Sequence, residues 1–232
     1  MTINKGDFIK IIYTGRILDD NSVFDTTDQE IAKKEGFEKK NIEPVVIRVG
    51  DGQLIQGLDE DVLGKELNKD YSVNIIPEKA FGKKSAKLIQ LVSLSKFKNE
   101  NIKPMPGLQV QINDQMGIVK TVTGGRVMVD FNHPLSGKDV KYEYKILNII
   151  KDDIEKIKSY FLTSFGIKEI DVKKTEKGFE IETKNPMPDI IKEEFNKKLK
   201  EIISDKEEYI FISKNDENKI KNAEIKKTDG KE

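Results

Sequence analysis

The sequence predicts an α+β protein that is built mainly from antiparallel strands and divided into three parts. Short apolar segments with a period of two predict a sheet that starts near the beginning of the chain and resumes after residue 139. A β-rich interval separates these segments, and beyond residue 150 helical and strand patterns alternate. We therefore expect a sheet wrapped on one short helix, a small β-rich insert and a C-terminal α/β unit.

The strands of the first sheet are predicted where β-branched and aromatic residues cluster or alternate with polar ones. These segments are 8–14, 45–49, 71–75 and 142–146. Between the second and third, Ile55, Leu58 and Val62 share one helical face, and Gly64 stands where a helix cap is favoured. One short helix is therefore expected to cross the sheet.

The insert is predicted from a break in this pattern between residues 84 and 132. A stop at 103–107, which holds two prolines and a glycine, is followed by strand patterns at 108–112, 116–122 and 126–131. Thr123-Gly124-Gly125-Arg126 has the composition of a hairpin turn.

The remaining chain is predicted as helix 152–165, strands 169–173 and 179–183, helix 188–204 and strand 209–212. Residues 214–232 are polar and without periodicity, so we expect a mobile tail there. The domain boundaries predicted on this basis are 1–83 with 133–150, then 84–132, then 151–213.

Composition excludes several classes of function. The chain has 232 residues, 36% apolar content and 11 phenylalanines, which is enough to build cores. Its 41 basic and 41 acidic residues balance, and only three arginines are present, so nucleic-acid partners are not expected. The absence of cysteine and of a long apolar run predicts a cytoplasmic protein without disulfides, thiol chemistry or a membrane span.

Six tracts carry a resemblance to a known family. These tracts occur in the order and spacing of FKBP-type peptidyl-prolyl cis/trans isomerases, so the chain resembles this family. Its insert resembles that of the SlyD-like branch, and the whole chain is similar to the long archaeal form. The tracts are Tyr13, 23–25, 49–50, 54–58, 76–82 and Tyr142. The resemblance covers about residues 1–150.

This resemblance implies a half-barrel of antiparallel strands around one helix, with no cofactor and no metal. It implies a prolyl site with catalytic residues Tyr13, Phe24, Asp25, Ile55 and Tyr142. It places further substrate-binding residues at Val45, Leu54, Leu58 and Phe81.

Three of these positions depart from the family pattern. Leu58 stands where a tryptophan is common, Phe81 where a tyrosine hydroxyl is common, and Val45 where an aromatic is common. These changes leave less aromatic surface and remove one donor, so tight binding of the family's macrolide inhibitors is not expected. Prolyl turnover is expected to survive.

The insert carries a second expectation. Met105, Met116 and Met128 lie in it with Leu108, and flexible thioethers suit a surface that binds many apolar sequences. Through the resemblance, we expect the insert to bind unfolded chains as a chaperone does. The alternative from the residues alone is that these side chains form the core of the insert.

Two further alternatives stay open at this stage. The protein is either an isomerase acting on unfolded or proline-containing polypeptides, or a noncatalytic module that docks proline-containing partners. A homodimer through the C-terminal domain is also open. His133, the single histidine, is expected to be structural, where the insert rejoins the sheet, because no cysteine or second histidine completes a metal site.

Overall fold

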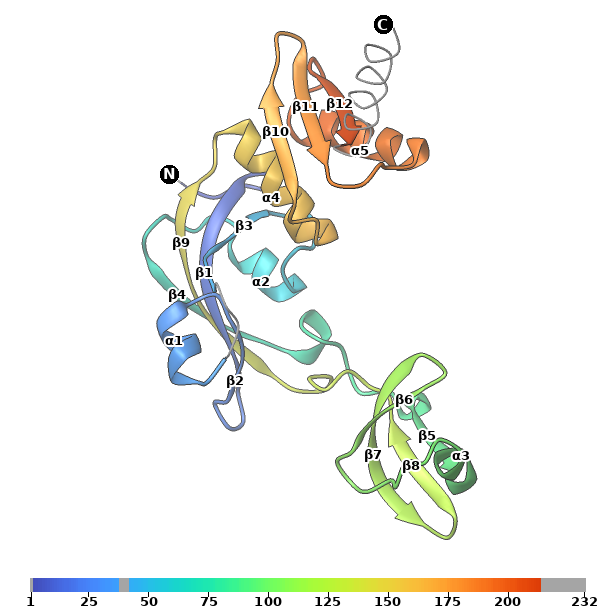
Figure 1. Cartoon of the computed structure of the whole chain (residues 1–232). Helices are drawn as coiled ribbons and strands as arrows, with labels where there is room; N and C mark the ends of the chain where they lie inside the picture. Colours follow the sequence, from blue (N-terminus) through green and yellow to red (C-terminus); the bar gives the residue numbers. More distant parts are fainter. Residues whose placement is uncertain (1, 38–41, 214–232) are drawn as a thin grey trace, which may run out of the picture.

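The computed structural model describes residues 2–37 and 42–213, so the tail predicted at 214–232 lies outside the described residues. Three sheets account for the strands of this part of the chain. Figure 1 shows the five-stranded sheet in the middle, the four-stranded sheet at one end and the three-stranded sheet at the other. The predicted α+β class with mainly antiparallel sheets is confirmed.

The five-stranded sheet has β1 at its centre. Its strands run in the order β2-β1-β9-β4, β3 also pairs with β1, and every pairing is antiparallel. β2 and β3 pair with different halves of the same edge of β1, and β9 pairs with its other edge. The ten residues of β1 can therefore pair with three strands. The strands are β1 Phe8–Ile17, β2 Val23–Thr26, β3 Val45–Arg48, β4 Asp70–Ile75 and β9 Val140–Ile149.

The helix α2 (Gln56–Asp61) covers one face of this sheet, as expected. It packs Leu58 and, just past its end, Val62 against the sheet, and both side chains are almost fully buried. Their partners include Ile9, Ile11 and Ile146 from the two central strands. Burial of such aliphatic side chains contributes about 1.5–3 kcal/mol each.

A second short helix that the sequence pattern did not predict, α1 (Gln29–Lys34), follows β2. The Asp28 carboxylate caps it by accepting hydrogen bonds from the Glu30 and Ile31 amides. With six residues and Ala32 as its one buried side chain, α1 has no periodic apolar face long enough to be seen in the sequence.

The four-stranded sheet forms the insert and runs in the order β5-β8-β7-β6, with all neighbours antiparallel. Its hairpin between β7 and β8 turns at Gly124 and Gly125, both with positive φ, as the sequence predicts. One face packs on the unexpected helix α3 (Leu94–Asn99) through Phe97. The strands are β5 Ile89–Ser93, β6 Gln109–Ile112, β7 Gln115–Thr123 and β8 Arg126–Asp130.

Two antiparallel connections join the insert to the central sheet. The first contains the short 3-10 helices Pro77–Lys79 and Ala86–Leu88. The second is held to it by the Gly137 amide, which donates to the Gly82 carbonyl at 2.8 Å, and by the Ser85 amide, which donates to Asn132 Oδ1 at 2.8 Å. These bonds fix both ends of the insert at one place beside Phe81.

The three-stranded sheet lies near the C-terminus and agrees with the predicted pattern to within two residues at each boundary. β10 pairs antiparallel with β11, whereas β12 returns through α5 to pair parallel with β11. Phe161, Phe195 and Leu199 from the two helices pack on Phe179 and Ile181 from the sheet. The elements are α4 Asp153–Phe165, β10 Ile170–Lys174, β11 Gly178–Thr183, α5 Asp189–Ile202 and β12 Glu208–Ser213.

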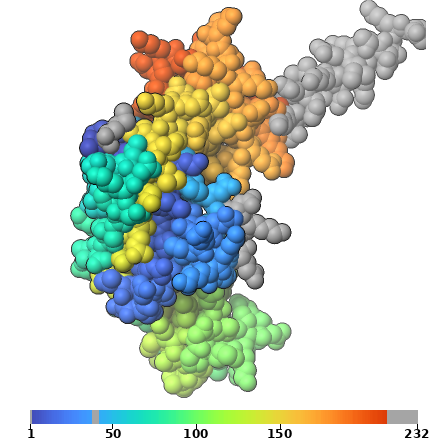
Figure 2. Space-filling view, turned by 90° about the vertical axis from the view of Figure 1, so that its left-hand side faces the viewer, coloured from blue at the N-terminus to red at the C-terminus, as the bar shows by residue number. Residues whose placement is uncertain are grey.

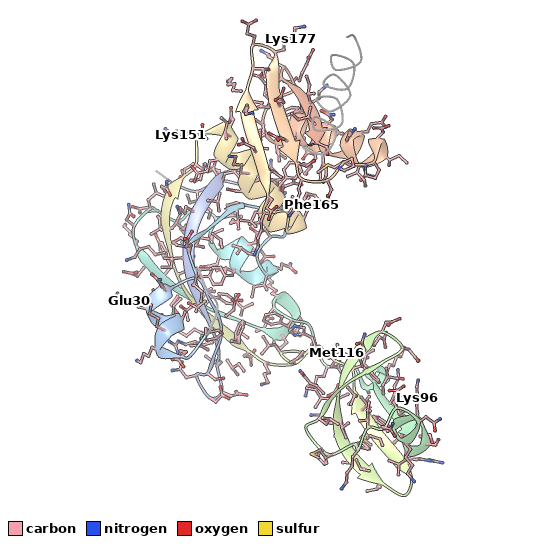
Figure 3. The ribbon with its side chains drawn as sticks, in the orientation of Figure 1. Glu30, Lys96, Met116, Lys151, Phe165 and Lys177 are labelled. Atoms are coloured by element: carbon pink, nitrogen blue, oxygen red, sulfur yellow. The ribbon has the colours of Figure 1, made fainter. Side chains whose placement is uncertain are left out.

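A small apolar cluster joins this unit to the central sheet. Tyr160 of α4 is 6% exposed and packs with Phe8, Val46 and Ile150. Figure 3 labels Lys151, at the junction between β9 and α4, and Phe165, at the far end of α4. Figure 2 shows the insert and the C-terminal unit at opposite ends of the molecule.

Candidate functional site

The residues expected to be catalytic converge on the centre of the five-stranded sheet. Gly15 of β1 is in register with Asp25 of β2 on one side and with Tyr142 of β9 on the other. Tyr13 lies two residues before Gly15 on the same face of β1. Three neighbouring strands therefore bring Tyr13, Asp25 and Tyr142 together although they are far apart in the sequence.

Aromatic rings form the walls of this cluster. The Phe24 ring meets Tyr142 edge to face at a centroid distance of 5.8 Å and Phe81 at 5.5 Å. Tyr13 and Tyr142 lie 5.7 Å apart in a tilted arrangement. Phe24, Phe81 and Tyr13 are each half-buried, so part of their surface is open to solvent. A compact apolar group can contact these exposed ring faces.

A hydrogen bond holds the one acid of the site. The Tyr13 hydroxyl donates to Asp25 Oδ2 at 3.0 Å. The backbone next to this pair is fixed by Thr27, whose hydroxyl accepts from the Tyr13 amide at 2.8 Å and whose amide donates to the Tyr13 carbonyl at 2.9 Å. Burial raises the pKa of Tyr13 and Tyr142, and the Asp25 charge raises both further, so the two phenols stay neutral.

The residue just before α2 supplies a free donor beside these rings. Ile55 is the residue before α2, in an extended conformation, and its carbonyl accepts from the Leu58 and Asp59 amides at 3.0 Å each. Its own amide donates to no other group within residues 2–37 and 42–213. Val45, Leu54 and Ile55 are half-buried and pack on the same apolar cluster as Tyr142.

Leu58 lies deeper than the other expected substrate-binding residues. It is 1% exposed and sits inside the core beneath the site. It can therefore form the floor of the site but presents almost no surface of its own.

Two residues that the sequence reasoning did not place in the site shape it. A Cβ atom on Gly15 would lie 2.6 Å from Phe24 Cζ and 3.1 Å from Tyr142 Cζ, so the absence of a side chain makes room for both rings. His133 stacks on Phe81 with ring centroids 4.9 Å apart and planes at 2°. His133 thus packs against a wall of the site. In the sequence, only its position where the insert rejoins the sheet indicated this location.

The expected insert residues do not form one cluster. Leu108 is half-buried against the insert core, whereas Met105 and Met116 are 55% and 57% exposed and Met128 is partly exposed. Met116 is labelled in Figure 3. The alternative of a methionine core for the insert is therefore wrong for Met105 and Met116, because phenylalanine and valine side chains fill that core instead.

No group of three or more histidine, cysteine, aspartate or glutamate side chains within the described residues could hold a metal ion. In the same part of the chain, no helix is long and apolar enough to cross a membrane. The arrangement of the site is suited to binding an uncharged group among rings, with one carboxylate and one backbone amide at its edge.

Comparison with known proteins agrees with this geometry. The sequence profile of the FKBP-type peptidyl-prolyl cis-trans isomerase family matches residues 1–98, and the profile described as the FKBP26 IF domain matches residues 90–135. The short-type peptidyl-prolyl cis-trans isomerase of Methanocaldococcus jannaschii is 33% identical over 149 residues, which are 63% of this chain and 94% of that protein.

Bacterial relatives cover a shorter part of the chain. A probable FKBP-type 16 kDa peptidyl-prolyl cis-trans isomerase of Pseudomonas fluorescens is 32% identical over 46% of this chain and 73% of its own length. The SlyD isomerase of Helicobacter pylori is 32% identical over 50% of this chain and 64% of its own length. The chain belongs to the family of FKBP-type peptidyl-prolyl cis-trans isomerases.

Proposed function

We propose that the rings around Gly15 hold the proline of a polypeptide while its X-Pro bond rotates, and that this activity serves protein folding. The observation that carries the proposal is the convergence of Phe24, Phe81 and Tyr142 around a single hydrogen-bonded acid. A half-barrel of residues 1–83 and 133–150 would form the catalytic domain.

The reaction needs no proton transfer, which fits a site whose two phenols stay neutral. Rotation about an amide bond costs about 18–20 kcal/mol because resonance is lost. The twisted amide has less charge separation than the planar one, so apolar surroundings disfavour the ground state relative to the transition state. An acceleration of a thousandfold requires only about 4 kcal/mol.

Each residue has a proposed role. Phe24 and Tyr142 hold the ring of the substrate proline over the Leu58 floor, with Val45, Leu54 and Phe81 completing the apolar wall. The Ile55 amide donates to a substrate carbonyl. Asp25, held by Tyr13, orients the rotating carbonyl through its charge.

A protease-coupled isomerase assay on a short proline peptide tests these roles. We expect Asp25→Ala and Tyr142→Ala to lower kcat/KM by tenfold or more. Asp20→Ala is the matched control, because Asp20 is an exposed carboxylate in the turn before β2 and its partner is Ser22. Unchanged turnover in both site variants would refute the assignment.

We further propose that the insert, residues 84–132, binds unfolded chains through the outer face of its sheet. Leu91 of β5 is 60% exposed and is in register with Met128 of β8. Ile89 and Met116, 39% and 57% exposed, lie on the same face, as the strand registers show. This apolar surface is open because α3 covers only the opposite face.

Suppression of aggregation of an unfolded client tests this proposal. Leu91→Ser should weaken suppression while leaving isomerisation of short peptides unchanged. Gln90→Ser is the control, since Gln90 is exposed on the opposite face of the same strand. Deletion of residues 84–132 should remove suppression altogether, and full retention after deletion would overturn the proposal.

The remaining assignments are proposals about the whole protein. We propose residues 151–213 as a third domain, and light scattering on the full chain and on residues 1–150 would show whether it makes a homodimer. We propose that the protein acts on unfolded or proline-containing polypeptides in the cytoplasm, a reducing compartment that suits a chain without cysteine.

A further inference from the structure

The segment that leads to Ile55 is a loop with two glycines in the left-handed conformation. It runs from Gly50 to Leu54, and both Gly50 and Gly52 have positive φ. Glycine has a large freedom in the unfolded and locally unfolded chain, so a loop with two of them needs external contacts to hold one conformation. Because Ile55 follows directly, any movement of this loop moves its free amide.

One anchor of the loop comes from the central sheet and α2. The Gly50 amide donates to both carboxylate oxygens of Asp59, at 2.9 and 3.1 Å. Asp51 pairs with Arg48 at 2.5 Å. These contacts hold the beginning of the loop. At its end, Leu54 packs on the apolar core and Gln53 provides the hydrogen bonds.

Gln53 bridges the loop to the C-terminal unit. Its Oε1 accepts from the Arg48 amide at 2.7 Å, and its Nε2 donates to Ser164 Oγ at 2.6 Å. Ser164 lies in the last turn of α4, 111 residues further along the chain. The side-chain oxygen of Gln53 therefore binds the sheet, and its side-chain nitrogen binds the helix.

The helix that carries Ser164 is itself fixed to the central sheet. Tyr160, one turn before Ser164, is buried with Phe8 and Val46. Burial is the main cause of the raised pKa of Tyr160; the Lys198 charge and a hydrogen bond with Ser164 oppose this effect, and the Asp51 and Glu201 carboxylates add to it. α4 thus contacts the loop through Ser164 and the central sheet through Tyr160.

We infer that the C-terminal unit is a positioning element for catalysis: the Ser164–Gln53 hydrogen bond holds the loop that presents the Ile55 amide to the substrate. The inference rests on the proposed role of Ile55. In this arrangement Ser164 and Gln53 touch no substrate, and they act through the loop. The active site is therefore supported by a residue of the C-terminal unit, outside residues 1–83 and 133–150 of the proposed catalytic domain.

The test uses full-length protein and a matched set of variants. Ser164→Ala removes the hydroxyl from an exposed position, so the fold is expected to stay intact. Ser164→Thr keeps the hydroxyl and should restore wild-type behaviour. Thr163→Ala is the control, because the Thr163 hydroxyl bonds within α4 to the Ser159 carbonyl and does not reach the loop.

Two measurements separate this inference from the proposed role of Ile55. We expect NMR order parameters of the amides at 51–55 to fall in Ser164→Ala, and KM for a proline peptide to rise about two- to fivefold with kcat unchanged. Gln53→Ala should raise KM at least as much, and adding Ser164→Ala to it should change little further.

Order parameters that stay at the wild-type value in Ser164→Ala would overturn the inference, whatever the activity. So would an equal KM increase in Thr163→Ala, which would indicate general loosening of α4. A more mobile loop with an unchanged KM would support the positioning of the loop by Ser164 and would count against Ile55 as the substrate-binding donor.

Discussion

Gly15→Ala is the perturbation that most directly tests the ring cluster as the prolyl site. The added Cβ would lie 2.6 Å from Phe24 Cζ and 2.9 Å from Phe24 Cε2. Carbon atoms pack at about 3.5–4.0 Å, so the Phe24 ring must move by roughly 1 Å. The backbone of β1 itself is not strained, because Gly15 has an ordinary strand conformation that any residue can adopt.

The expected loss of activity is larger than the loss of stability. A displacement of about 1 Å in a substrate-positioning group can cost about a hundredfold in rate, so we expect kcat/KM to fall by tenfold to a hundredfold. Overpacking costs about 1–3 kcal/mol, but Phe24 is half-exposed and can move outward, and alanine also reduces the entropy of the unfolded chain. We therefore expect the free energy of unfolding to fall by about 1 kcal/mol.

The assay is protease-coupled isomerisation of a proline peptide, with urea unfolding measured on the same samples. Gly117→Ala is a matched control, because its Cβ would lie 2.6 Å from Val129 Cγ1 and 2.8 Å from Phe131 Cδ1, in the insert. It should loosen the insert without changing turnover of the peptide. A folded Gly15→Ala protein with the kcat/KM of the wild type would refute the prolyl site described above.

Three further predictions follow from the contacts of the site and its supports. Tyr13→Phe removes the donor to Asp25, so the free energy of unfolding should fall by about 1 kcal/mol in urea titrations; an unchanged value would show that the bond does not stabilise the fold. Because Tyr13 and Tyr142 have pKa values raised above the ordinary value of about 10, the native state holds more protons than the unfolded state above that pH. The stabilising contribution of these two phenols should therefore be fully present below pH about 10 and be lost as the pH rises further. The phenolate absorbance of the folded protein should appear at higher pH than that of the unfolded chain, and coincident titrations would contradict this. Tyr160→Ala should open the junction between α4 and the central sheet at a cost of about 3 kcal/mol, seen as easier proteolysis near residue 151, whereas unaltered cleavage would argue against that junction as a support.

Periodicity made most elements predictable, and the exceptions have clear physical causes. The long patterned segments of β9, α4 and α5 carry enough apolar residues to be recognised. α1 and α3 were missed because each has six residues and one buried side chain, so their identity depends on capping by Asp28 and Ser93 and on packing. Short elements of this kind are stabilised by tertiary contacts more than by propensity.

The insert shows that the sequence alone does not determine on which face of a strand a side chain lies. Met116 and Val119 lie on opposite faces of β7, and the register of the sheet shifts between Val119 and Thr121. A shift of one residue exchanges the inner and outer faces of a strand. Methionine content alone could not tell an exposed Met116 from a core one, and the strand pairing decided it.

What the amino-acid sequence determined by itself is local: the alternation of the strands, the face of α2, the turn at Gly124 and the ordered tracts that mark the family. What only the tertiary structure decided is which distant groups meet. Gly15 opens space for two rings, His133 stacks on Phe81, and Ser164 reaches Gln53 across 111 residues. These contacts depend on strand register and helix packing, which arise from the whole core and leave no periodic signal in the residues that make them.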